Sequence, residues 1–161
     1  MRKITEKKWV TGSGKVIDFY QILRIIKSYL IKGSKVFIGT DSFISNGKVC
    51  FATALCLHGP GQPGRYFFYR DNESSNIFKV LVSRITEEVN RSLELAQLLI
   101  QEYKIEPSLI ELHLDISTSE SGNATSKFSD MLRGYVQGFG LDYRLKPDAW
   151  ASQSIADKHS K

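Results

Sequence analysis

Residues 36–41 read VFIGTD, an apolar run that ends in the carboxylate of Asp41. A second run, residues 109–115, reads LIELHLD and ends in Asp115. Both runs have the length and apolar content of buried strands. A carboxylate at the end of a buried strand is costly to desolvate unless it faces a cation. Two such strand ends side by side in one sheet predict a site of hard oxygen ligands for Mg²⁺ or Mn²⁺.

Helical and extended patterns surround these two runs. Residues 16–31 carry apolar side chains at helical spacing, and the pair Asn46-Gly47 predicts a hairpin after the first strand. The expected elements are a helix at 16–31, strands at 35–41, 49–57 and 65–70, a long helix ending near residue 103, a strand at 109–115, a helix at 126–137, a strand at 141–145 and a short helix beyond residue 147.

This order of elements predicts an α/β fold. We expect one domain over residues 1–161, built on a five-stranded mixed sheet with helices on both faces and an additional N-terminal helix. Three antiparallel strands come first, and an αβαβα segment follows. If the first strand is central, the 109–115 strand can lie parallel beside it. Asp41 and Asp115 then meet at one edge of the sheet, within about 5 Å of each other if they share an ion.

Two further carboxylates could complete the site. Glu87 and Glu88 compete on the long helix. Glu87 shares its face with Arg91, a face that we expect to be solvated, whereas the side of Glu88 is narrow and rich in small residues and could pack on the sheet. We therefore favour Glu88. Asp157, near the C-terminus, is the fourth candidate, with a surface residue beside lysines as the alternative.

Other polar residues are candidates for supporting roles. His159 could shuttle a proton or help product release, or be a solvated histidine of the tail. His113, inside a strand, is expected to be a satisfied core or sheet-face histidine. The segment 117–127 precedes a helix, where its N–H groups could hold a phosphate or be capped in the ordinary way. The residues expected to contact nucleic acid are Ser42, Asn123, Lys127, Lys146 and Lys158.

Composition is compatible with a nucleic-acid partner. The 161 residues include 22 basic and 17 acidic side chains, for a net charge of +5. A modest positive charge suits phosphate binding, although an ordinary soluble surface can carry it too. No apolar stretch approaches the roughly 20 residues of a membrane span. The first residues are charged and are not followed by the apolar segment of a signal peptide, so we expect a cytoplasmic protein.

Three motifs, taken in order, resemble a known family. They are FIGTDS at 37–42, LHLDI at 112–116 and SIADKH at 154–159. Together they resemble the YkuK-like family of bacterial ribonuclease H-related proteins, and the likeness covers nearly the whole chain. The sequence departs from the family pattern at Phe43, where a polar side chain such as glutamine is expected. The resemblance implies a ribonuclease H-like fold and a nuclease with acidic metal ligands.

The motifs and the resemblance favour a divalent-metal-dependent nuclease that hydrolyses phosphodiester bonds by a two-metal mechanism. Asp41 and Asp115 would flank two Mg²⁺ or Mn²⁺ ions, and Glu88 and Asp157 would each complete one of them. The expected partners are RNA, RNA–DNA hybrid or branched DNA. The alternative is a non-catalytic nucleic-acid-binding module on the same fold. An ATPase is disfavoured because no glycine-rich phosphate loop follows the first strand.

Overall fold

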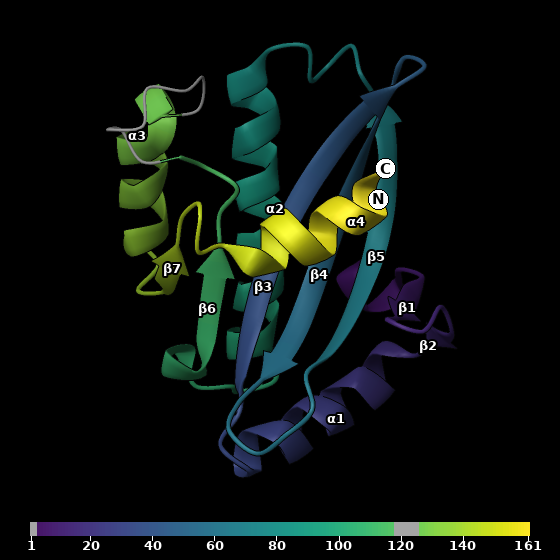
Figure 1. Cartoon of the computed structure of the whole chain (residues 1–161), viewed down its shortest axis with the longest axis vertical. Coiled ribbons are helices and arrows are strands. Elements are labelled where there is room, and N and C mark those ends of the chain that lie inside the picture. The colour runs from purple at the N-terminus through teal and green to yellow at the C-terminus, as the bar shows by residue number, and fades with distance from the viewer. Residues whose placement is uncertain (1–2, 118–125) are drawn as a thin grey trace.

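The computed structural model describes residues 3–117 and 126–161, with side chains from residue 128 onward in the second range. The described chain forms one mixed sheet in the order β2-β1-β5-β4-β3-β6-β7 (Figure 1). The strands are β1 (Trp9–Thr11), β2 (Val16–Ile17), β3 (Lys35–Ser45), β4 (Lys48–His58), β5 (Arg65–Ser74), β6 (Ile110–His113) and β7 (Asp142–Arg144). The helices are α1 (Phe19–Ile31), α2 (Leu81–Gln101), α3 (Ser126–Gln137), the π-helix η3 (Ala151–Ala156) and α4 (Asp157–Ser160), with 3₁₀ turns η1 (Ile4–Glu6) and η2 (Pro107–Leu109).

The prediction of five strands was wrong, because the sheet of the described residues has seven. The two additional strands, β1 and β2, form a short N-terminal hairpin that pairs with β5. Strands of two or three residues are too short to show an alternating pattern, and the apolar residues of β2 extended the helical pattern that follows. The helix begins at Phe19 instead, because the Asp18 carboxylate accepts a hydrogen bond from the Tyr20 N–H at 2.7 Å and caps it.

The predicted order of the remaining elements is confirmed. β3, β4 and β5 are consecutive antiparallel strands, and β6 and β7 follow through α2 and α3 in parallel pairing. The β3–β4 turn is the predicted Asn46-Gly47 pair, and both residues have positive φ (51° and 73°) as the tight hairpin requires. However, β3 is longer than expected. Asp41 lies inside this strand opposite Ala52, not at its end.

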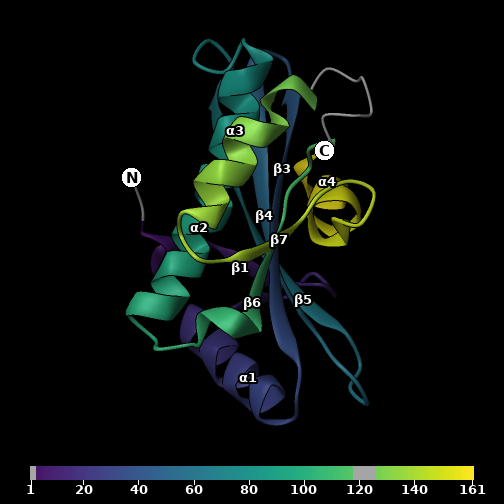
Figure 2. The ribbon, with the colours of Figure 1, turned by 90° about the vertical axis from the view of Figure 1, so that its left-hand side faces the viewer.

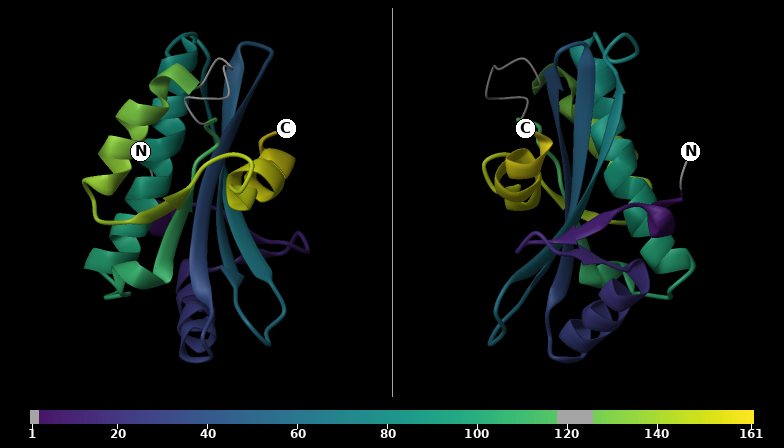
Figure 3. Two further views of the ribbon diagram at one scale, coloured as in Figure 1. Left: turned by 60° about the vertical axis from the view of Figure 1, so that its left-hand side comes forward. Right: turned by 90° about the vertical axis from the view of Figure 1, so that its right-hand side faces the viewer.

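Helices cover both faces of the sheet, as predicted. Figures 2 and 3 show α1, α2 and α3 on one side and the C-terminal helical segment on the other. The larger apolar core lies under the first three helices and includes Trp9, Phe19, Ile38 and Leu95. A smaller cluster lies under the C-terminal segment and includes Phe37, Phe68 and Ala156. Within the described ranges, no helix has both the length and the apolarity needed to cross a membrane.

The C-terminal segment approaches the sheet most closely at Gly39. A Cβ atom at this position would lie 2.4 Å from the Ser152 N atom and 2.7 Å from the Ala151 carbonyl carbon. Any side chain larger than that of glycine would therefore displace the η3 backbone. This contact explains why glycine stands in the middle of a buried strand, where it is otherwise unfavourable.

His113 fastens the same segment to β6. Its Nδ1 accepts a hydrogen bond from the Ala151 N–H at 3.0 Å, so the proton lies on Nε2, which donates to Glu111 Oε1 at 3.2 Å. Burial, and secondarily the charge of Arg144, lowers the pKa of His113 to about 4. His113 is thus a neutral, satisfied histidine of the sheet face, as predicted.

We expect the substitution Gly39→Ala to destabilise the protein by about 1–3 kcal/mol, because the new methyl group meets backbone that cannot rotate away. The free energy of unfolding, measured by urea denaturation, tests this. Gly134→Ala in α3 is the matched control, since a Cβ atom there meets nothing within 4 Å. The control should gain up to about 1 kcal/mol from helix propensity. Equal stability of Gly39→Ala and the wild type would contradict the close contact.

Candidate metal and catalytic site

The pairing of β3 with β6 brings two of the predicted carboxylates together. The last pair in this parallel ladder is Gly39 with His113, and the same register continued by two residues places Asp41 opposite Asp115. The Asp41 carboxyl group interacts with those of Asp115 and Asp157, and both interactions raise its pKa. Because β6 ends at His113, Asp115 lies just beyond the last residue of this ladder.

Asp41 is a buried carboxyl group with a raised pKa. It is 6% exposed, and its burial raises the pKa most, followed by the hydrogen bond and the charge of Asp115. The Ser160 hydroxyl donates to Asp41 Oδ2 at 3.0 Å and acts in the opposite direction. The resulting pKa of about 8 means that Asp41 holds a proton at neutral pH in the metal-free protein.

Glu88 reaches the site from α2, on the opposite face of the sheet. The helix is anchored one turn further on, where Ser92 Oγ lies 2.8 Å from Thr40 Oγ1. Glu88 itself is 7% exposed and accepts a hydrogen bond from the Ser42 hydroxyl at 2.5 Å. Burial raises the pKa of Glu88 well above its usual value, and the charges of Asp41 and Asp115 raise it further.

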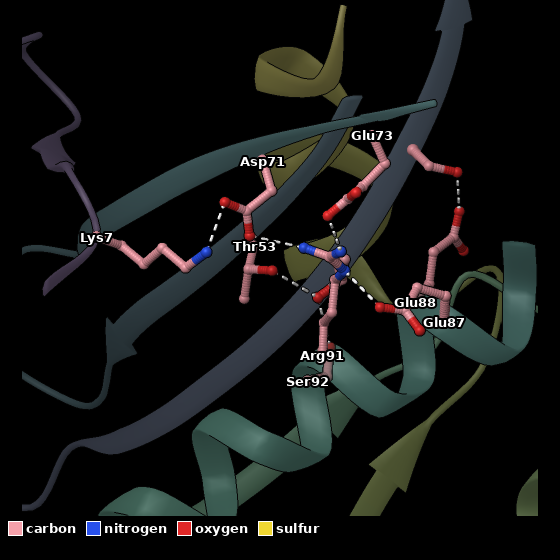
Figure 4. A network of polar contacts seen from close by, with 10 residues as sticks. Lys7, Thr53, Asp71, Glu73, Glu87, Glu88, Arg91 and Ser92 are labelled. Atoms are coloured by element: carbon pink, nitrogen blue, oxygen red, sulfur yellow. Dashed lines mark hydrogen bonds and ion pairs between the residues drawn. The ribbon is translucent and has the colours of Figure 1, made fainter. Parts of the chain in front are cut away.

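The neighbouring Glu87 has a different role. Figure 4 shows Glu87 pointing toward Arg91 and Glu88 pointing away from it. Arg91 donates to Glu87 Oε1 at 2.9 Å, to Asp71 Oδ2 at 2.7 Å and to Glu73 Oε1 at 3.4 Å. Its side chain is only 7% exposed, so the expectation that this face of the helix is solvated was wrong. Glu87 is thus part of the Arg91 network, and Glu88 is the helix carboxylate on which the charges of Asp41 and Asp115 act.

Asp115 and Asp157 lie nearer to solvent, and each has a lysine partner. Lys146 Nζ lies 3.0 Å from Asp115 Oδ1, and Lys161 Nζ lies 3.2 Å from Asp157 Oδ2. The two lysines thus pair with two of the four carboxyl groups. The buried pair, Asp41 and Glu88, accepts hydrogen bonds from the hydroxyl groups of Ser160 and Ser42.

Several other predicted site residues have contacts within the protein or lie on its surface. His159 stacks on the Phe68 ring with centroids 3.7 Å apart, and its Nε2 lies 3.0 Å from the Tyr66 hydroxyl. Ser42 is hydrogen-bonded to Glu88 instead of facing a ligand, and Lys158 is exposed. Asn123 and the side chain of Lys127 are outside the described residues.

Ser160 is a site residue that the sequence analysis missed. A helical spacing of three from Asp157 could have indicated it, because residues three apart share a helix face. Its hydroxyl group connects the end of α4 to Asp41 and holds the fourth carboxylate near the other three.

The chemistry of this donor set fits a hard divalent cation. Within residues 3–117 and 126–161 no group of three or more His, Cys, Asp or Glu side chains forms a ready-made ligand shell. The four candidate ligands are nevertheless all carboxylates, the oxygen donors that Mg²⁺ and Mn²⁺ prefer. Two of them are buried with raised pKa values, and a cation would relieve that repulsion.

We expect the metal-free protein to lose stability as the pH rises from about 4 to about 8. The folded protein holds the Asp41 proton over this range while the unfolded chain releases it, so the free energy of unfolding falls. Asp41→Asn should reduce this loss, to which the buried Glu88 also contributes, and should be more stable than the wild type at pH 8 by about 1–3 kcal/mol. Urea denaturation in EDTA at several pH values measures this difference in the free energy of unfolding. The lowered pKa of His113 makes stability rise with pH in both proteins, so its contribution cancels from the difference.

Asp142→Asn is the matched control, because Asp142 is exposed on β7. It should follow the pH profile of the wild type. If Asp41→Asn also followed the wild-type profile, Asp41 would not be protonated in the fold.

Comparisons with known proteins place the chain in a family. No curated protein and no solved structure matches it. A family model described as Ribonuclease H-like matches residues 18–161, which include β3 to β7, α2 and all four carboxylates. The match agrees with the observed mixed sheet, which is covered by helices on both faces. The chain therefore belongs to the Ribonuclease H-like family.

Proposed function

We propose that this protein is a divalent-metal-dependent nuclease that hydrolyses phosphodiester bonds. The observation that supports the proposal is the interaction of the Asp41 carboxyl group with those of Asp115 and Asp157, together with the buried Glu88, whose pKa the charges of Asp41 and Asp115 raise. Membership of the Ribonuclease H-like family supports a function that involves nucleic acid. Clustered, buried carboxylates are costly to maintain without a cation, and a fold gains nothing from them.

In this proposal Asp41 and Asp115 would be ligands of two Mg²⁺ or Mn²⁺ ions, and Glu88 and Asp157 would each complete one ligand set. Such ions polarise a phosphodiester and lower the pKa of a bound water. The protein supplies the positioning. Ser42 fixes the Glu88 carboxylate from β3, and Ser160 fixes Asp41 from α4.

Without a metal, the negative charge of the carboxylates is reduced by the proton on Asp41 and by the lysines paired with Asp115 and Asp157. Asp41 must release its proton, whose pKa is about 8, so metal binding is coupled to proton release. Lys146, whose Nζ lies 3.0 Å from Asp115 Oδ1, would be available to a phosphate oxygen if Asp115 instead held a cation.

A second candidate function is a nucleic-acid-binding module without catalysis. The Lys146–Asp115 and Lys161–Asp157 ion pairs favour it, because two of the four carboxylates are already paired with lysines of the chain. Metal binding and cleavage assays separate the two functions.

We expect wild-type protein to cleave labelled nucleic acid in Mn²⁺, and Asp41→Asn and Asp157→Asn to reduce the rate at least about 100-fold. The panel of substrates comprises RNA, RNA–DNA hybrid, branched DNA and single-stranded DNA. Asp157→Asn should bind the same substrates in EDTA as tightly as the wild type or more tightly, because one repulsive charge is lost. Asp142→Asn, which changes an exposed aspartate of β7, is the control and should retain full activity.

Unchanged cleavage by Asp157→Asn would remove that residue from the ligand set. No cleavage of any substrate by the wild type, together with tight binding, would favour the binding module.

A further inference from the structure

The face of the sheet under α4 continues past the helix as an open surface. Figure 1 shows η3 and α4 crossing β3, β4 and β5, with the β3–β4 hairpin extending beyond them. A groove of about 590 Å³ lies there, between the hairpin and the end of α4. A second hollow of about 290 Å³ adjoins it toward β1, and both include Cys50, Arg70 and Asn72 in their walls.

The strand register connects this groove to the candidate metal site. Asp41 pairs with Ala52, and Ala52 pairs with Arg70, so these residues form one row across the sheet. The β1–β5 register continued by two residues adds Lys8 to the same row. With strands about 4.8 Å apart, the Cα atom of Arg70 lies about 10 Å from that of Asp41. The next row contains Phe43, Cys50 and Asn72.

Charges on β5 and on the segment before β1 are sorted by face. Asp71 and Glu73 point toward α2, where Lys7 and Arg91 bind them. Arg70 and Lys8, each one position away, point to the open face and are exposed. No acidic side chain of the described ranges pairs with Arg70, Lys8 or Lys48. The open face therefore carries cations that the fold itself leaves uncompensated.

We propose that this surface, the Arg70 groove, holds a single strand of nucleic acid and leads it across β5 and β4 to Asp41. The groove is lined by Lys8, Phe43, Lys48, Arg70, Asn72 and Lys161. Cleavage of the strand at Asp41 rests on the proposed function. Binding of the strand rests on the groove alone.

The shape and the side chains favour one strand over two. A space of this size accepts a group as large as a nucleotide. The ring of Phe43 is 42% exposed at the wall of the groove. A cationic track with an exposed aromatic ring is the arrangement by which proteins bind single strands, through phosphate contacts and base stacking.

The test is binding of fluorescein-labelled single strands of about 12 nucleotides, RNA and DNA, and of the matching duplexes, measured by anisotropy in EDTA over a range of salt concentrations. The double variant Lys8→Gln/Arg70→Gln should bind single strands about tenfold or more weakly, and its salt slope should fall by about 0.7 for each lost phosphate contact. Phe43→Ala should weaken binding without changing the slope, because stacking releases no counterions.

The matched control is Arg24→Gln/Lys27→Gln, which removes the same charge from exposed positions of α1 on the other face of the sheet. It should bind like the wild type. Thermal unfolding of each variant checks that the fold is kept. Single-strand binding unchanged by Lys8→Gln/Arg70→Gln, tighter binding of duplex than of single strand, or no binding by the wild type would each overturn the proposal.

Cleavage assays in Mn²⁺ separate this proposal from the proposed function. If the wild type binds strands through Arg70 and never cleaves them, the groove stands and the nuclease proposal fails. If the wild type cleaves and Lys8→Gln/Arg70→Gln keeps the same KM, the nuclease proposal stands and the groove fails. The RNA and DNA arms show which sugar the groove accepts.

Discussion

The parallel pairing of β6 beside β3 is the constraint on which the rest of the site depends. Its register sets Gly39 opposite His113 and thereby Asp41 opposite Asp115. The same two strands also hold η3, through the bare backbone of Gly39 and the Nδ1 atom of His113. A shift of one residue would turn every side chain of β3 to the other face. The juxtaposition of Asp41 with Asp115 and the attachment of η3 to the sheet would then both be lost.

The two faces of the sheet differ in how their charged side chains are paired. On the α2 face, the acidic side chains of β5 are neutralised by Arg91, which also lies 4.4 Å above the Phe51 ring, and by Lys7. That face is a closed core with a satisfied ion network. On the α4 face, Asp41 is buried under Ser160, and basic residues lie exposed in the adjoining groove without an acidic partner among the described residues. Charge left uncompensated in this way indicates where a ligand is expected.

The sequence predicted the parts of the fold that repeat a pattern over many residues. The central strands, the long helix and the Asn46-Gly47 turn were readable from apolar runs and turn chemistry. The hairpin of β1 and β2 was not, because its pairing depends on β5, which is distant in the sequence. The end of β3 was misplaced because Asp41 reads as a strand terminus, although its partner Ala52 continues the ladder.

The candidate site shows the same division. The carboxylate residues could be named because their positions follow strand and helix periodicity. Their partners could not, because contacts such as Lys146 with Asp115 and Ser42 with Glu88 depend on the tertiary arrangement. Arg91 was read as solvated since helix periodicity shows which residues share a face, but not what covers that face.

The short helix α4 carries a consequence for motion. Its four residues form little more than one turn, the last of the helical segment that begins with η3. It is held by the contacts of Ser160 and His159 with the sheet. Local opening of such a segment requires less free energy than unfolding of the strands beneath it. One side of the candidate site can therefore become solvated while β3 and β6 stay folded.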